Sequence, residues 1–140
     1  MPTPQQVVAA ARTHLGARWM HQARLPREAM DCDGLVILVA RELGIVAPDF
    51  DVNAYSRVPD GTMQAVCDQH MQRIAEPELG AVLLLQPYDQ PQHMGIVGDY
   101  RHGGHSLIHA DSLRGRVVES RWLAFRNMKL VGAYRLPGVA

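Results

Sequence analysis

Net charge, cysteine and long hydrophobic runs are all scarce in this sequence. Fourteen basic residues balance fourteen acidic ones, so no strong electric field favours nucleic acid or an anionic membrane as a partner. The longest strictly apolar run covers only residues 35–40, whereas a helix that crosses a bilayer needs about 20 apolar residues. We therefore expect a protein that binds no nucleic acid and contacts no membrane.

Disulfides and a secretion signal are also not indicated. Two cysteines, Cys32 and Cys67, could form at most one bridge. The first residues, "MPTPQQVVAAARTHLG", lack the basic region and the apolar stretch of a signal peptide. We expect synthesis in a cytoplasm, where reducing conditions keep thiols unpaired.

The composition suits one globular domain. A chain of 140 residues can bury a hydrophobic core without disulfide or metal support. Its apolar fraction of 47% and charged fraction of 20% are ordinary for such a domain. Because no repeat, low-complexity segment or linker interrupts the chain, we expect a single domain over residues 1–140.

The first residues predict a helix followed by a loop. Residues 3–16 offer Thr3 as an N-cap, Pro4 in the first turn and Gly16 as a stop. Residues 18–30 contain a proline and show no clear period. We expect that second stretch to form a loop.

A central helix is predicted to begin near Cys32. Its apolar run fits a buried strand or a buried helix on periodicity alone. The extension of the run to Leu43, with Gly44 as a natural C-cap, favours a helix that is buried on nearly every side. A third, short helix is expected in residues 62–74, with a possible turn to strand near Met71.

The second half of the chain predicts strands. Most of its aliphatic segments are short and bounded by Gly, Pro, Asp or Ser, which is typical of an antiparallel meander. Helices followed by strands indicate the α+β class, with about five strands in the sheet. The five segments are "GAVLLLQP", "HMGIVGDY", "SLIHAD", "GRVVES" and "LVGAYRLP".

Cys32 is the first candidate for chemistry. It lies at the expected start of the central helix, where the helix dipole favours a thiolate. Asp31 and Asp33 oppose thiolate formation, although Asp31 could cap the helix or either could bind a cationic group of a substrate. Gly34 would leave room for a substrate backbone near the sulfur. A half-buried structural cysteine beside an aspartate cap is the alternative interpretation.

Two histidines could supply a base for this thiol. His93 opens one predicted strand and His109 nearly closes the next. If the two strands pair in antiparallel fashion, both side chains reach the same sheet edge. One imidazole can then orient the other, as the third member of a catalytic triad orients its base.

A metal site is the competing interpretation of the histidines. Cys67 and His70 have the spacing C-x-x-H, and His102, His105 and His109 follow within a short stretch. Structural zinc usually has four close ligands with thiolates well represented, and the second half of the chain has no cysteine. We therefore predict neither a metal nor any other cofactor.

The chain resembles the NlpC-type cell-wall cysteine peptidases, which are papain-like in fold, and within them the tail peptidases of phages and gene transfer agents. The matching pieces span nearly the whole chain, and their order and spacing are more specific than any one alone. They are "LGARWMHQARLP", "DCDGLVILVARELG", "LGAVLLLQP", "HMGIVGD", "LIHAD", "VVES" and "AYRLPG".

The resemblance implies roles for the candidate residues. Cys32 would be the nucleophile, His93 the general base and acid, and His109 the residue that orients His93. Asp31 and the position after the cysteine, here Asp33, would help to bind a substrate amine. The implied fold has N-terminal helices, with the cysteine on the central one, packed on an antiparallel sheet.

Two departures from the family pattern affect the site. Many members carry serine after the cysteine, where this chain has Asp33. Many also carry an upstream tyrosine whose hydroxyl helps to stabilise the oxyanion, and Trp19 occupies the corresponding place. His21 or Gln22 could supply that donor instead.

The resemblance implies a cysteine endopeptidase that hydrolyses an amide bond in peptidoglycan stem peptides, typically between D-glutamate and a diamino acid. It would be made in a bacterial host cytoplasm and then carried on a virion tail beside other tail-tip proteins. A structural tail-tip or assembly component with little activity, and a Cys-His amidase or acyltransferase, remain as alternatives.

Overall fold

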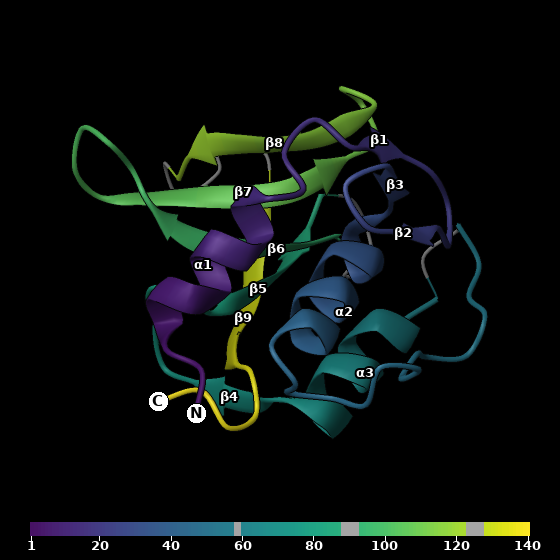
Figure 1. Ribbon diagram of the computed structural model, residues 1–140, viewed down its shortest axis with the longest axis horizontal. Helices are drawn as coiled ribbons and strands as arrows, with labels where there is room; N and C mark the ends of the chain where they lie inside the picture. The colour runs from purple at the N-terminus through teal and green to yellow at the C-terminus, as the bar shows by residue number, and fades with distance from the viewer. Residues whose placement is uncertain (58–59, 88–92, 123–127) are drawn as a thin grey trace.

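The computed structural model describes residues 1–57, 60–87, 93–122 and 128–140. In these residues three helices lie against one curled sheet (Figure 1). The helices are α1 (Pro4–Arg12), α2 (Cys32–Glu42) and α3 (Thr62–His70). The strands are β1 (Arg18–Trp19), β2 (Arg24–Leu25), β3 (Ala29–Met30), β4 (Gln72–Ile74), β5 (Val82–Gln86), β6 (His93–Asp99), β7 (His105–Asp111), β8 (Arg116–Arg121) and β9 (Lys129–Arg135).

The α+β class is confirmed, but the prediction of about five antiparallel strands is wrong. The described sheet has nine strands in the order β2-β3-β1-β8-β7-β6-β5-β9-β4, and β1 pairs with β3 in parallel. The five predicted segments are β5 to β9. The additional strands are only two or three residues long, too short to show a period of their own.

The segment 18–30, predicted as a loop, forms three of these short strands. Its backbone groups bond to one another and to the sheet: Arg18 donates its N–H to Glu28 O at 2.9 Å, and Trp19 donates to Gly115 O at 2.8 Å. These pairings satisfy backbone groups that a loop would leave to water. The segment is therefore a fixed extension of the sheet that folds beside the start of α2.

The predicted meander is confirmed for β5 to β8 and wrong for the last strand. β9 pairs with β5 and β4 instead of β8. The pairing places Ala133 and Tyr134 at buried positions next to β5. Hydrophobic burial thus brings the chain's last strand to the opposite side of the meander.

The helix predictions hold with changed ends. α1 begins with the expected Thr3 cap, whose hydroxyl accepts the Gln6 N–H at 3.2 Å, but it ends at Arg12. The Gly16 N–H then bonds to Val117 O in the sheet at 3.0 Å. The third helix gives way to strand β4 after Met71, as expected. No helix in the described ranges is long and apolar enough to cross a membrane.

Helix α2 is the centre of the core. Residues 32–40 are all buried, between α1 and the strands β6 and β7. Apolar side chains from α1, α2 and the sheet form one continuous cluster, including Val7, Leu35, Val39, Ile96 and Ile108. A second cluster occupies the other face of the sheet. Because α2 is packed on every side, its first residue is held in a defined position.

Gly34 allows the 18–30 segment to approach α2 closely. A Cβ at this position would lie 2.6 Å from the backbone oxygen of Ala23 and 3.0 Å from the Met30 Cβ. The prediction that Gly34 leaves room for a substrate is therefore wrong, since the protein's own backbone occupies that side. The glycine fixes the distance between the helix start and the wall beside it.

We expect Gly34→Ala to destabilise the protein by about 1–3 kcal/mol, the usual cost of adding a methyl group to a filled site. The contact is with backbone, which cannot rotate away. Urea denaturation followed by circular dichroism measures the change. A midpoint equal to that of the parent would contradict this account of Gly34.

Candidate active site

The start of α2 is organised by a buried carboxylate. Asp31, which is 3% exposed, is the N-cap and accepts the Gly34 N–H on Oδ1 at 2.8 Å. Cys32 is the first residue of the helix that this cap begins. The aspartate thus sets the direction in which the helix enters the core and the place of the thiol.

Three further donors reach Asp31 from outside the helix. Arg24 forms an ion pair with Oδ1 at 2.9 Å, the Gln22 N–H donates to Oδ2 at 2.7 Å, and the Tyr55 hydroxyl also donates to Oδ2. Both carboxylate oxygens therefore have two donors each. Asp31 thus caps the helix, one of the two roles that the sequence suggested for it. Its other suggested role, binding a substrate amine, stays a prediction.

The Cys32 thiol is buried beside a second carboxylate. Its side chain donates a hydrogen bond to Asp33 Oδ1, with an Sγ–Oδ1 distance of 3.4 Å. Burial, and then the charges of Asp33 and Asp31, raise the pKa of the Cys32 thiol well above its ordinary value; a backbone hydrogen bond from Met94 opposes this. Burial and the acidic neighbours outweigh the helix start, which the sequence suggested would favour the thiolate.

Asp33 is itself perturbed by this environment. It is 5% exposed, and burial, followed by the charge of Asp31, raises its pKa to about 6, whereas Arg24 and the thiol lower it. No ion pair joins Asp33 to a basic side chain within the part of the chain that the structure describes. The residue is a carboxylate at neutral pH without a cation of its own.

The two predicted histidines meet at one sheet edge. β6 and β7 pair in antiparallel fashion with Ile96 opposite Ile108, so the start of one strand lies beside the end of the other (Figure 1). His93 Nε2 and His109 Nδ1 are 2.7 Å apart, a hydrogen-bond distance. Burial, and then His109, lower the pKa of His93 to about 3; burial also lowers the pKa of His109. Both rings are neutral at physiological pH.

The thiol and both histidines line one hollow, which we call the reactive cleft. It has a volume of about 290 Å³. Trp19 and His21 also line it, so two of the three predicted oxyanion donors are on its wall. The guanidinium of Arg57 lies 5.0 Å from the centre of the Trp19 ring. The remaining lining includes Asp31, Asp33, Tyr55, Met63, Asp111 and Leu113.

Gln22, the third predicted donor, is not among the residues that line the cleft. Its side-chain amide donates to the backbone oxygen of Tyr55 at 2.6 Å, and His21 Nε2 lies 3.1 Å from the same oxygen. Gln22 therefore ties the segment 51–56 to the wall of the cleft.

Sequence reasoning missed Tyr55. Its hydroxyl accepts a hydrogen bond from Arg24 at 2.9 Å and donates to Asp31. Burial is the main cause that raises its pKa, so it stays a neutral donor. A tyrosine 23 positions after the cysteine, in a segment without a period, carries no local signal of this contact.

The residues considered for metal are dispersed. Cys67 is buried on α3, with its sulfur 3.6 Å from the Met94 sulfur, while His70 packs edge-on against Phe50. In the described ranges no three His, Cys, Asp or Glu side chains are grouped so that they could hold a metal ion. Neither cysteine is in a disulfide.

Asp33→Asn is expected to stabilise the protein at neutral pH. The folded state holds the carboxyl pKa near 6 instead of 3.8, which corresponds to about 3 kcal/mol lost once the group is ionised. Because the folded pKa is raised, this loss develops as pH rises from about 4 through 6. Urea denaturation should therefore show a gain of about 3 kcal/mol at pH 7 that disappears near pH 4.

Asp49→Asn is the matched control, because Asp49 is an exposed carboxyl in the turn region after α2 and does not line the cleft. It should leave stability unchanged at both pH values. An Asp33→Asn gain that is equal at pH 4 and pH 7 would contradict the raised pKa.

Comparison with solved structures identifies the fold. No protein-family model matches the chain, and no curated protein sequence matches it significantly. Solved structures do: NlpC2 from Trichomonas vaginalis has a TM-score of 0.69 at 17% identity over 97% of this chain. The NlpC/p60 domain of the peptidoglycan hydrolase SagA has a TM-score of 0.61 at 17% identity, covering 96% of this chain and 99% of that domain.

A third similar structure is an N-acetylmuramoyl-L-alanine amidase from Bacteroides uniformis, with a TM-score of 0.64 at 11% identity over 96% of this chain and 98% of the amidase. The chain spans only 47% of the Trichomonas protein. At these identities the likeness concerns the fold. The chain has the papain-like fold of NlpC/P60 domains, with Cys32 at the start of α2.

Proposed function

We propose that the protein is a cysteine peptidase that hydrolyses an amide bond in peptidoglycan stem peptides. The observation that carries the proposal is the convergence of the Cys32 thiol with the hydrogen-bonded pair His93–His109 in one cleft. Similarity to the fold of a peptidoglycan hydrolase supports the substrate class. Cys32 acts as the nucleophile.

The protonation states favour general-base catalysis over a preformed ion pair. The Cys32 pKa is raised and the His93 pKa is lowered, so thiol and imidazole are both neutral at rest. His93 takes the thiol proton as the sulfur attacks the amide carbonyl, and it later protonates the leaving amine. Water then hydrolyses the acyl-enzyme.

The histidine pair sets the tautomer that this step requires. Nε2 of His93 faces His109 Nδ1, which leaves Nδ1 of His93 to receive the proton. Nδ1 can accept only if the ring carries its hydrogen on Nε2, which then donates to His109. His109 is therefore a positioning residue that holds His93 in the reactive tautomer.

The oxyanion of the tetrahedral intermediate needs donors near Cys32. The backbone N–H of Cys32 at the helix start is one, and the indole of Trp19 or the ring of His21 on the cleft wall is a second. Such donors typically contribute a factor of about 10²–10³ to the rate. Asp33 takes part in binding the substrate amine.

We further propose that the bond cleaved lies between D-glutamate and a diamino acid, and that the protein works on a phage or gene-transfer-agent tail. In this setting it is made in the bacterial host cytoplasm and joins other tail-tip proteins. Mass spectrometry of purified particles tests the assignment. Detection of peptides from this chain in purified tails would support the tail assignment. Their detection only in the soluble cell fraction would contradict it.

An amidase that cleaves the bond between N-acetylmuramic acid and L-alanine is the second candidate, because the fold is also similar to that of such an enzyme. The same cysteine and histidines would serve it, since a Cys–His pair determines acyl transfer and not the bond attacked. The products distinguish the two enzymes.

We expect the purified protein to cleave disaccharide-linked stem peptides at the D-glutamate–diamino acid bond, read by mass spectrometry. Cys32→Ala should form no product, because the attacking sulfur is gone. His93→Ala should lower kcat by about 10²–10⁴, and His109→Ala by about 10², the cost of a misplaced base.

Cys67→Ala is the control, since it removes the other thiol, which is buried on α3 away from the cleft lining. This variant should retain activity. Release of the whole stem peptide from the sugar would establish the amidase instead. No cleavage of any bond by a folded parent protein would favour a structural tail component.

A further inference from the structure

One histidine outside the reactive cleft is completely buried. His14 lies in the turn that follows α1 and is 0% exposed. Its Nε2 is 3.0 Å from Oε1 of Glu42, the last residue of α2. On the other side of the ring, Nδ1 is 3.0 Å from the backbone nitrogen of Arg27 in the segment 18–30. One side chain thus joins the end of α1, the end of α2 and the segment that walls the cleft.

The partners of the His14 ring determine where its hydrogen lies. The backbone N–H of Arg27 can only donate, so Nδ1 of the ring is the acceptor and carries no hydrogen. The single hydrogen of the neutral ring is therefore on Nε2, next to Glu42. A second proton has to enter at Nδ1, where it would point at the Arg27 N–H. Protonation of the ring therefore removes the acceptor of that hydrogen bond.

The backbone of Arg27 has an unfavourable conformation that this hydrogen bond helps to hold. Its φ angle is 61°, in the left-handed region that residues with a side chain rarely adopt. The next residue closes the turn, since the Glu28 N–H donates to Leu25 O at 3.0 Å. A strained conformation persists only while the surrounding contacts outweigh its cost. The bond to His14 is one of those contacts.

A proton on His14 also opposes the second contact of Arg27. The Arg27 guanidinium lies 3.9 Å from Glu42 Oε1, the same oxygen that faces His14 Nε2. A charged imidazolium binds a carboxylate more strongly than a neutral ring does, and it repels the guanidinium beside it. One proton therefore acts against both the backbone contact and the side-chain contact of Arg27.

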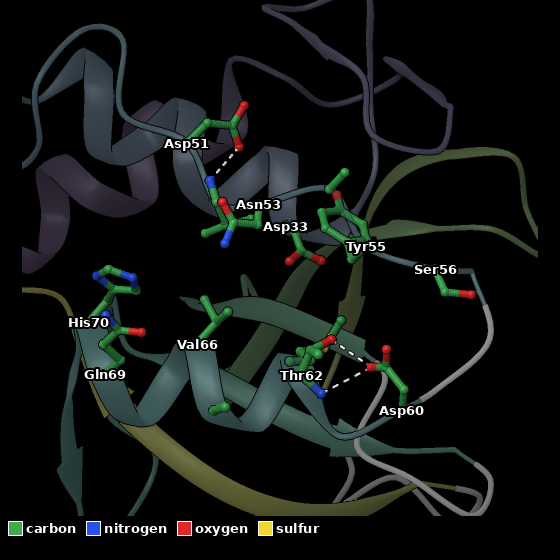
Figure 2. A pocket seen from close by; sticks show the side chains of 14 residues that line it. Asp33, Asp51, Asn53, Tyr55, Ser56, Asp60, Thr62, Val66, Gln69 and His70 are labelled. Atoms are coloured by element: carbon green, nitrogen blue, oxygen red, sulfur yellow. Dashed lines mark hydrogen bonds between the residues drawn. The ribbon is translucent and has the colours of Figure 1, made fainter.

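The turn at Arg27 is three residues from Arg24, which attaches the segment to the site. Arg24 pairs with Asp31 Oδ1 at 2.9 Å and donates to the Tyr55 hydroxyl at 2.9 Å. Tyr55 also lines a hollow beside α3, where Figure 2 shows it next to Asp33. A change at Arg27 therefore reaches the start of α2 through one short stretch of chain.

We propose that His14 is an acid-sensitive switch: its neutral ring holds the turn at Arg27, and protonation at Nδ1 releases the segment 18–30 from the wall of the cleft. The segment is held at neutral pH, because burial is the main cause that lowers the pKa of His14, although the charge of Glu42 raises it. Because the folded pKa is lowered, the held form is complete above the ordinary pKa of about 6.5 and is lost as pH falls below it.

Other charged side chains on the surrounding elements lie outside this contact. Arg12 of α1 and Arg41 of α2 pair with acidic side chains. Further charges on the segment 18–30 and on β8 are exposed to water, which screens them; these are Arg18, Glu28 and Arg116. Among the described residues, Glu42 and Arg27 are the ones whose charges shift the pKa of His14.

Hydrogen exchange read by mass spectrometry tests the switch, with exchange times scaled for the intrinsic effect of pH. Peptides from residues 18–30 of the parent should lose protection at least several-fold between pH 7.5 and pH 5, while peptides from β5 to β7 should not. In His14→Asn the side-chain oxygen accepts the Arg27 N–H in place of Nδ1 and takes up no proton. This variant should keep its protection at both pH values.

His102→Asn is the matched control, because it removes an exposed histidine from the turn between β6 and β7. It should lose protection in residues 18–30 as the parent does. A second measurement needs no variant: nitrogen-15 NMR of the imidazole ring follows the protonation of His14 in the parent. Its midpoint should coincide with that of the exchange in residues 18–30.

Three results would overturn the proposal. They are an equal loss of protection in His14→Asn, protonation of His14 without a loss in residues 18–30, and a loss that affects β5 to β7 to the same extent. Neither measurement uses hydrolysis, so the switch stands or falls independently of the proposed function.

Discussion

The buried carboxylate of Asp31 is the contact on which the arrangement of the site depends. It joins three parts of the chain: the first turn of α2 through Gly34, the 18–30 segment through Gln22 and Arg24, and the segment 51–56 through Tyr55. Loss of Arg24, the basic partner of this carboxylate, would leave a buried charge without an ion pair, which is costly. Asp31 therefore fixes the helix start, the wall of the cleft and the segment 51–56 relative to one another.

That construction sets the electrostatics of the thiol. A helix N-terminus favours an anion, but here the cap is itself an anion and a second carboxylate follows the cysteine. Burial adds to the effect of the two carboxylates, and together they keep the pKa of the Cys32 thiol high. The raised pKa favours the protonated thiol over the thiolate at neutral pH. In the proposed mechanism the reaction therefore starts from the neutral thiol, whose proton His93 accepts as the sulfur attacks.

Local sequence patterns predicted much of the fold, because helices and the longer strands show characteristic patterns of apolar residues over short stretches of the chain. The apolar run after Cys32 with Gly44 behind it determines α2, and short aliphatic segments determine β5 to β8. The meeting of His93 and His109 followed from one hairpin, since antiparallel pairing alone fixes which residues face each other. The two-residue strands in 18–30, the pairing of β9 with β5, and the contact of Tyr55 with Asp31 depend on distant partners and left no periodic signal.

The sequence by itself determined the helices and the five longer strands, a cysteine at the start of a buried helix and two histidines at one sheet edge, because each follows from residues near one another in the chain. Only the tertiary structure decided the charge state of the site. The pKa values of Cys32, Asp33 and His93 depend on burial and on groups brought from other segments. The same is true of Gly34, whose missing side chain admits the Ala23 carbonyl. Packing between distant segments, which no local pattern encodes, adds the burial that is the main cause of the raised pKa of the Cys32 thiol.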